Sequence, residues 1–152
     1  MGYKCEVKEK KAQPVISVRT NSAVQDLPQV LGKYYGAIAQ YLGELRENPT
    51  GPPFVAYYNL DMQNLDIEIG FPVSKKLGGK EDIKMSEIPS GRFASCLFTG
   101  PYNEIEPAYN ELNQWLEEKG YESTGVAYEV YLNDPSQTPP EDLKTEILFP
   151  LK

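Results

Sequence analysis

The pentapeptide IGFPV at residues 69–73 has a counterpart, ILFPL, at residues 147–151. The second copy starts 78 residues after the first, and Thr99 follows Thr20 at the similar interval of 79 residues. Each pentapeptide ends a run rich in β-branched and aromatic residues, which is typical of a β-strand. The matching intervals indicate that the chain consists of two copies of one structural unit.

Two amphipathic helices occupy equivalent places in these copies. Residues 27–45 carry apolar side chains at steps of three and four, with Asp26 as a candidate N-cap and Pro28 in the first turn. Residues 105–119 repeat the pattern and end before Gly120, a typical helix stop. Trp115 lies on the apolar stripe of this second helix and is therefore predicted to belong to the core.

Strand-like runs flank both helices, one before each helix and two after it. The runs are residues 15–20, 54–60 and 65–73 in the first copy, and 93–99, 125–132 and 143–151 in the second. Residues 74–80 are predicted to be a linker, and residues 133–142, with Pro135, a surface loop. The predicted fold is α+β: tandem duplicated βαββ units forming two antiparallel sheets, with a helix on each and a central cleft. Residues 1–152 would form one domain with halves at about 3–73 and 80–151.

The composition excludes several classes of function. With 15 basic and 22 acidic residues the net charge is −7, which disfavours direct binding of nucleic acid. Histidine is absent, which excludes Ser-His-Asp catalysis and histidine metal ligands. Cys5 and Cys96 have no metal-like spacing, so we expect two reduced thiols, no metal and no cofactor. Without a membrane-length apolar run or a secretory segment, a soluble cytoplasmic protein with no membrane partner is expected.

Strand alternation in the second copy selects a candidate site. The apolar residues that the helix should cover are Val126, Tyr128, Val130 and Leu132. Alternation then predicts Ala127, Glu129 and Tyr131 on the opposite face. One acid beside a small residue and an aromatic ring suits a cationic or planar ligand. A solvated strand carboxylate is the alternative interpretation of Glu129.

The first copy leaves two alignments open. Alternation predicts the helix-facing residues Phe54, Ala56, Tyr58 and Leu60, with Val55, Tyr57 and Asn59 opposite. Aligning residues 55–58 with 126–129 would instead match Tyr58 with Glu129 and turn Tyr57 inward, so both tyrosines remain candidates. Glu68 is predicted to lie opposite the helix face, where it and its repeat equivalent Glu146 are either ligand-binding acids or solvated or structural ones.

Four segments resemble GyrI-like proteins and the effector-binding domains of AraC-type and MerR-type multidrug regulators. They are residues 51–57 (GPPFVAY), 66–73 (DIEIGFPV), 100–102 (GPY) and 128–135 (YEVYLNDP), and the resemblance runs over roughly residues 3–151. It implies a tandem βαββ fold and a central pocket in which Glu129 meets ligands beside Tyr57 and Tyr131. It also implies that some stand-alone members hydrolyse cyclopropane-bearing toxins with a pocket glutamate and tyrosine.

Three functional hypotheses follow. The leading one is a multidrug-type binding module for small hydrophobic, often cationic or planar compounds, with ligand-binding candidates Glu129, Tyr57, Tyr58, Tyr131, Glu68 and Ala127. The second is a cofactor-independent hydrolase of strained-ring electrophiles, with Glu129 and Tyr131 as catalytic residues. The third is a gyrase-inhibitor-like factor that binds a basic protein partner. Because the 152 residues contain no helix-turn-helix pattern, a stand-alone binder or enzyme is expected.

Overall fold

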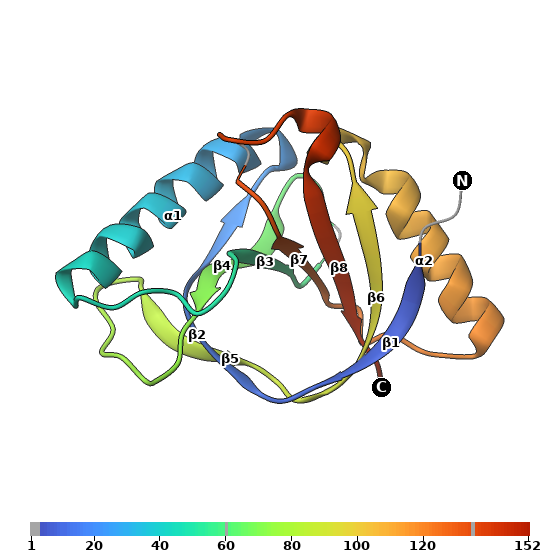
Figure 1. Cartoon of the computed structure of the whole chain (residues 1–152), viewed down its shortest axis with the longest axis horizontal. Coiled ribbons are helices and arrows are strands. Elements are labelled where there is room, and N and C mark those ends of the chain that lie inside the picture. Colours follow the sequence, from blue (N-terminus) through green and yellow to red (C-terminus); the bar gives the residue numbers. More distant parts are fainter. Residues whose placement is uncertain (1–3, 60, 135) are drawn as a thin grey trace. The chain divides into compact units, whose positions relative to one another are not determined.

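The computed structural model describes residues 4–59, 61–134 and 136–152. It divides into two compact units, the continuous unit, Ala12–Pro89, and the split unit, residues 1–11 with 90–152 (Figure 1). The predicted half boundary at residue 3, the strand end at Leu60 and the loop residue Pro135 lie outside the described residues. None of the helices in the described ranges is long and apolar enough to cross a membrane.

The continuous unit is a four-stranded antiparallel sheet in the order β3-β4-β2-β5 with helix α1 on one face. Its elements are β2 (Gln13–Ser22), α1 (Leu27–Glu44), β3 (Phe54–Tyr57), β4 (Leu65–Pro72) and β5 (Lys84–Ile88). Asp26 holds the N-cap position of α1 but makes no side-chain cap hydrogen bond. The helix stays in place because it packs Ile38 and Leu42 against Ile16 and Val18 of β2.

The split unit has the sheet order β1-β6-β8-β7 and is covered by helix α2. Its elements are β1 (Cys5–Lys10), β6 (Gly91–Thr99), α2 (Glu106–Lys119), β7 (Ala127–Tyr131) and β8 (Lys144–Pro150). Gly120 ends α2 with a left-handed φ of 76°, as its position in the sequence predicted. Leu112 and Leu116 of α2 pack against Ile147 of β8, and Trp115 is partly buried beside them.

Each unit therefore contains the predicted order of strand, helix, strand and strand, together with one strand that was not predicted. These extra strands, β1 and β5, have the sequences CEVKEK and KMSEI, and each stands at one end of the strand order of its own unit. Edge strands tolerate charged residues, so they lack the apolar alternation that identifies inner strands. β1 pairs with β6, and β5 pairs with β2, so the compact units do not coincide with the sequence halves 3–73 and 80–151.

The two cysteines are direct neighbours in the split unit. Cys5 of β1 lies opposite Cys96 of β6, and the structure holds both as thiols. Burial raises the pKa of Cys96 to about 12, so its thiolate is scarce at neutral pH. The pair therefore serves as core packing, and Cys96 should react slowly with alkylating reagents.

Candidate functional site

Glu129 lies on the face of the split unit that α2 covers. Residues directly opposite each other in an antiparallel pair share a face, and Glu129 and Tyr131 lie opposite Ile147 and Thr145 of β8. Ile147 belongs to the core cluster beneath α2, and Ala127 packs against the same cluster. The prediction that Ala127, Glu129 and Tyr131 share one face is confirmed, but the prediction that this face points away from the helix is wrong.

The face of Glu129 was predicted wrongly because strand β7 is covered on both sides. Tyr128, on the side away from α2, is only 4% exposed, and its ring meets the ring of Phe93 edge-on at 6.2 Å between centroids. Apolar alternation identifies the core side only when the other side faces water. In β7 the more apolar set of residues packs on the side without a helix.

Two tyrosine hydroxyl groups hold the Glu129 carboxylate. The hydroxyl of Tyr109 on α2 donates to Oε2, and the hydroxyl of Tyr131 on β7 donates to Oε1 at 2.9 Å. Burial raises the pKa of Glu129, and the two hydrogen bonds oppose this effect without cancelling it. The carboxyl group is thus partly desolvated, and each oxygen retains a lone pair for a further contact.

Further aromatic rings lie beside the two tyrosines that bind this carboxylate. The ring of Tyr102 lies 5.3 Å from that of Tyr131, and the ring of Tyr109 lies 5.8 Å from that of Phe149. Tyr102 follows Gly100, whose φ of 147° favours glycine and where a Cβ would lie 3.0 Å from a neighbouring phenylalanine ring. The GPY motif therefore positions one of the rings of the site.

Sequence reasoning missed Tyr109 and Tyr102 as site residues. Tyr109 lies on the apolar stripe of α2, which was assigned to the core as a whole. Its hydroxyl group was the available clue, since a tyrosine turned towards a core needs a hydrogen-bond partner and Glu129 supplies one. Within the described residues, no three His, Cys, Asp or Glu side chains lie close enough together to hold a metal ion.

Thr145 adds a testable feature on the face that carries Tyr131. Its side chain is fully buried, and its Oγ1 has no hydrogen-bond partner among the described residues. A buried hydroxyl without a partner costs about 1–3 kcal/mol. We therefore expect Thr145→Val, which keeps the shape, to raise the free energy of unfolding by about 1 kcal/mol or more in chemical denaturation. A loss of stability in Thr145→Val would show that the hydroxyl is satisfied in solution.

The first-copy face assignment for β3 is also wrong. Val55 and Tyr57 lie opposite Ile69 and Ile67 of β4 and so share the α1 face. The prediction had placed Phe54, Ala56 and Tyr58 on that face, whereas these residues take the other one. As in β7, both sides of β3 are covered, since residues 54–56 are all buried.

The sheet registers also decide between the two alignments. Val55 faces Ile69, and Glu129 faces Ile147, the residue 78 positions after Ile69. Val55 therefore takes in the continuous unit the place that Glu129 takes in the split unit, and the alignment of Tyr58 with Glu129 is wrong. By the same registers Tyr57 is the counterpart of Tyr131.

Tyr58 and Glu68 meet each other on the face of the continuous unit that α1 does not cover. The hydroxyl groups of Tyr58 and Ser17 both donate to the Glu68 carboxylate, the latter at 2.6 Å. Glu68 is 7% exposed, which rules out a solvated acid and leaves a ligand-binding or a structural one. A cavity of about 290 Å³ opens in front of it, lined by Ser17, Arg19, Tyr58, Glu68, Asp82, Lys84, Met85 and Ser86.

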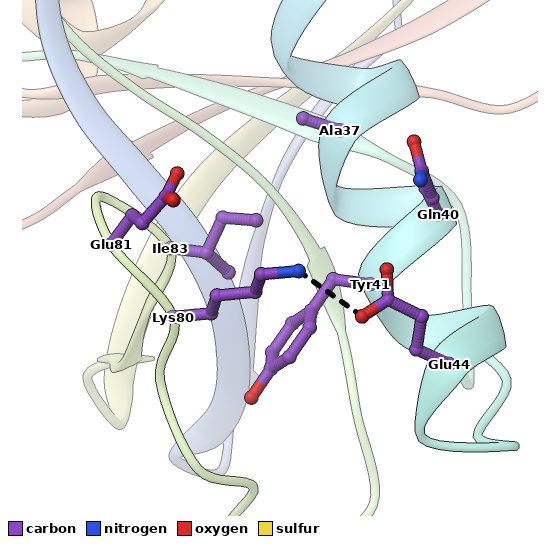
Figure 2. Close-up of a pocket in the computed structure, with 7 residues that line it drawn as sticks. All are labelled: Ala37, Gln40, Tyr41, Glu44, Lys80, Glu81 and Ile83. Atoms are coloured by element: carbon purple, nitrogen blue, oxygen red, sulfur yellow. Dashed lines mark hydrogen bonds and ion pairs between the residues drawn. The ribbon is translucent and has the colours of Figure 1, made fainter.

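A second, smaller hollow of about 130 Å³ lies between α1 and the segment before β5 (Figure 2). Lys80 reaches across it to Glu44 with an ion-pair distance of 3.1 Å, beside the ring of Tyr41. None of the predicted site residues lines this hollow. Its lining residues tie the linker to the helix, which is a structural role.

Comparison with known families assigns the chain. The model of the GyrI-like small molecule binding domain matches residues 3–152, so the chain belongs to the GyrI-like family of small-molecule-binding domains. This confirms the predicted family. No curated protein sequence matches the chain.

Solved structures show the same α+β fold, which confirms the predicted fold class. The C-terminal domain of EcmrR is 23% identical with a TM-score of 0.82, and 100% of this chain matches 99% of that one. EcmrR in its complex with DNA is 24% identical with a TM-score of 0.87. There 99% of this chain matches 57% of the EcmrR chain, so this chain spans little more than half of that protein's length. A hydrolase from Listeria innocua is 17% identical with a TM-score of 0.70, and 99% of this chain matches 93% of that one. SAV2435 bound to tetraphenylphosphonium is 12% identical with a TM-score of 0.65, and 100% of this chain matches 94% of that one.

Proposed function

We propose that this small-molecule-binding domain takes hydrophobic cations, with Glu129 as the charged group that selects them. The observation that carries the proposal is the partly desolvated Glu129 carboxylate between the hydroxyl groups of Tyr109 and Tyr131. A carboxylate in such surroundings gains more from a bound positive charge than one in water does.

The rings beside the carboxylate support a hydrophobic cation over a metal ion or a small polar one. Tyr102, Tyr109 and Tyr131 offer ring faces, which attract organic cations and exclude water from the charge contact. The likeness to SAV2435, a structure with bound tetraphenylphosphonium, supplies a suitable probe for this chain.

The test is a comparison of tetraphenylphosphonium with triphenylphosphine oxide, a neutral compound with similar rings. We expect the cation to bind more tightly in calorimetry and to raise the melting temperature further. A ligand present at about 100 times its dissociation constant stabilises a protein by about 2.7 kcal/mol, which thermal unfolding detects easily. Equal affinity for the two compounds would contradict the proposal.

A second candidate function is hydrolysis of strained-ring electrophiles at the same site. Its support is also the raised pKa of Glu129, since a carboxylate with a higher pKa is a better general base, and Tyr131 can donate a hydrogen bond to the electrophile. Incubation with cyclopropane-bearing electrophiles followed by mass analysis tests this function. Water added to the compound by the wild type and not by Tyr131→Phe would support it, and unchanged compound would leave the chain a binder.

A further inference from the structure

A serine–glutamate pair recurs in both units at an interval of 78 residues. In the continuous unit the Ser17 hydroxyl donates to Glu68 Oε2 at 2.6 Å, and in the split unit the Ser95 hydroxyl donates to Glu146 Oε2 at 2.9 Å. Both pairs lie on the sheet face away from the helix. The two carboxylates are therefore equivalent groups whose surroundings can be compared directly.

In the split unit a lysine occupies the space in front of the carboxylate. Lys8 Nζ of β1 lies 2.6 Å from Glu146 Oε2, and the Glu146 side chain is 14% exposed. Burial raises the pKa of Glu146, but the hydrogen bonds from Lys8 and Ser95 outweigh it and leave the pKa lowered. In the split unit, therefore, the carboxylate at this position binds a primary ammonium group.

The continuous unit has no equivalent lysine. In the split unit Lys8 lies opposite Phe93. The counterpart of Phe93 in the continuous unit, 78 positions earlier, is Val15, and the residue opposite Val15 is Ser86. A serine side chain is too short to reach Glu68, and the 290 Å³ cavity stands where the lysine side chain would run. The carboxylate is thus in place while the space for its cation is open.

No positive group that lines this cavity lies within ion-pair distance of Glu68, although Arg19 and Glu68 attract each other electrostatically. Arg19 lines it too, but its guanidinium binds Asp66 through two hydrogen bonds of 2.6 and 2.8 Å and stacks on the Tyr58 ring at 3.8 Å. Over the described residues, neither Glu68 nor Lys84 forms an ion pair. A carboxylate that is 7% exposed is costly unless a positive group meets it.

We propose that the cavity of the continuous unit is a second ligand site, which binds the primary ammonium group of a small amine against Glu68. The ammonium takes the place that Lys8 Nζ takes in the split unit and donates to Glu68. Tyr58 contacts the carbon chain of the amine. The site is separate from Glu129, which lies in the other unit, and does not depend on the function proposed for Glu129.

The test titrates the protein with n-butylammonium at neutral pH and follows backbone amide resonances by NMR. We expect shifts at Ser17, Tyr58 and Met85 that saturate, and much smaller ones with tetramethylammonium, which has no N–H to donate. Glu68→Gln should weaken binding about tenfold or more, since the ammonium then meets a neutral amide instead of a carboxylate. Glu146→Gln is the matched control, because its site is already filled by Lys8, and it should leave the affinity unchanged.

Ser86→Lys tests the same site at an exposed strand position where the fold is not at risk. It should reproduce the arrangement of the split unit, fill the cavity with its own ammonium and abolish amine binding. Unaltered amine affinity in Ser86→Lys, or an absence of saturating shifts at Ser17 and Tyr58 in the wild type, would overturn the proposal. Amine binding seen only after Lys84→Met would show that Lys84 serves Glu68 and would overturn it as well.

Discussion

Glu129→Gln is expected to weaken the binding of tetraphenylphosphonium by about tenfold or more, or about 1.4 kcal/mol, because the attraction between two opposite charges in a desolvated site is lost. The amide keeps the shape of the carboxylate and can still accept a hydrogen bond from Tyr109 or Tyr131. Affinity for a neutral compound of similar shape should change little. Isothermal titration calorimetry with both compounds measures the difference.

The same substitution is expected to stabilise the protein at neutral pH. Burial raises the pKa of Glu129 in the folded chain, so folding favours the protonated form. The stability of the wild type therefore declines as pH rises from the unfolded-state pKa through the folded-state pKa, while Glu129→Gln has no such loss. A variant that is less stable than the wild type above this window would contradict a desolvated carboxylate.

The matched control is Glu146→Gln, a glutamate of the same split unit whose pKa is shifted in the opposite direction. Its folded-state pKa lies below the unfolded value, so its contribution to stability is present above the unfolded pKa and is lost as pH falls. Glu146→Gln should therefore destabilise the protein at neutral pH and leave tetraphenylphosphonium affinity unchanged. Equal effects of the two substitutions on cation affinity would mean that general electrostatics, and not the Glu129 site, attracts the cation.

Leu112→Ala is expected to lower the free energy of unfolding by about 2–5 kcal/mol, the usual cost of truncating a fully buried leucine. Leu112 is 0% exposed and packs from α2 onto Cys96 and Ile147. Because Tyr109 lies on the same helix, a looser α2 should also weaken cation binding. Urea denaturation and calorimetry measure the two effects.

Gln114→Ala on the exposed side of α2 is the control for Leu112→Ala, and a surface change of this kind should alter stability by no more than about 0.5 kcal/mol. A Leu112→Ala protein as stable as the wild type would show that α2 does not pack on the sheet as described. That result would also mean that α2 does not hold Tyr109 in place as a hydrogen-bond donor to Glu129.

The sequence predicted the elements with strong internal patterns. The two helices follow a period of three to four apolar residues, and Gly120 ends the second one where expected. Six of the eight strands in the described residues were predicted from β-branched and aromatic runs, whereas β1 and β5 were missed. Those two are charged edge strands, and their partners lie far away in sequence, so no local pattern identifies them.

The candidate site was predicted only in part, because local sequence patterns do not show which distant segments pack on a strand. Glu129 and Tyr131 were chosen as neighbours on one strand face, and they do lie together. Their helix partner Tyr109 was not predicted, because sequence alternation indicates which residues share a face but not what covers a strand buried on both sides. Glu68 and Tyr58 were also selected together, and a tertiary contact rather than the predicted alignment with Glu129 brings them into one cavity.

The most direct test of the central claim is an NMR titration of the Glu129 side-chain carboxyl group, with and without saturating tetraphenylphosphonium. The account predicts a pKa above the ordinary glutamate range in the free protein, caused mainly by burial, and a lower pKa with the cation bound, because a nearby positive charge favours the ionised form. By linkage, cation affinity should fall as pH drops through the free-protein pKa. The same Glu129 pKa with and without a saturating cation would contradict the claim that this carboxylate binds it.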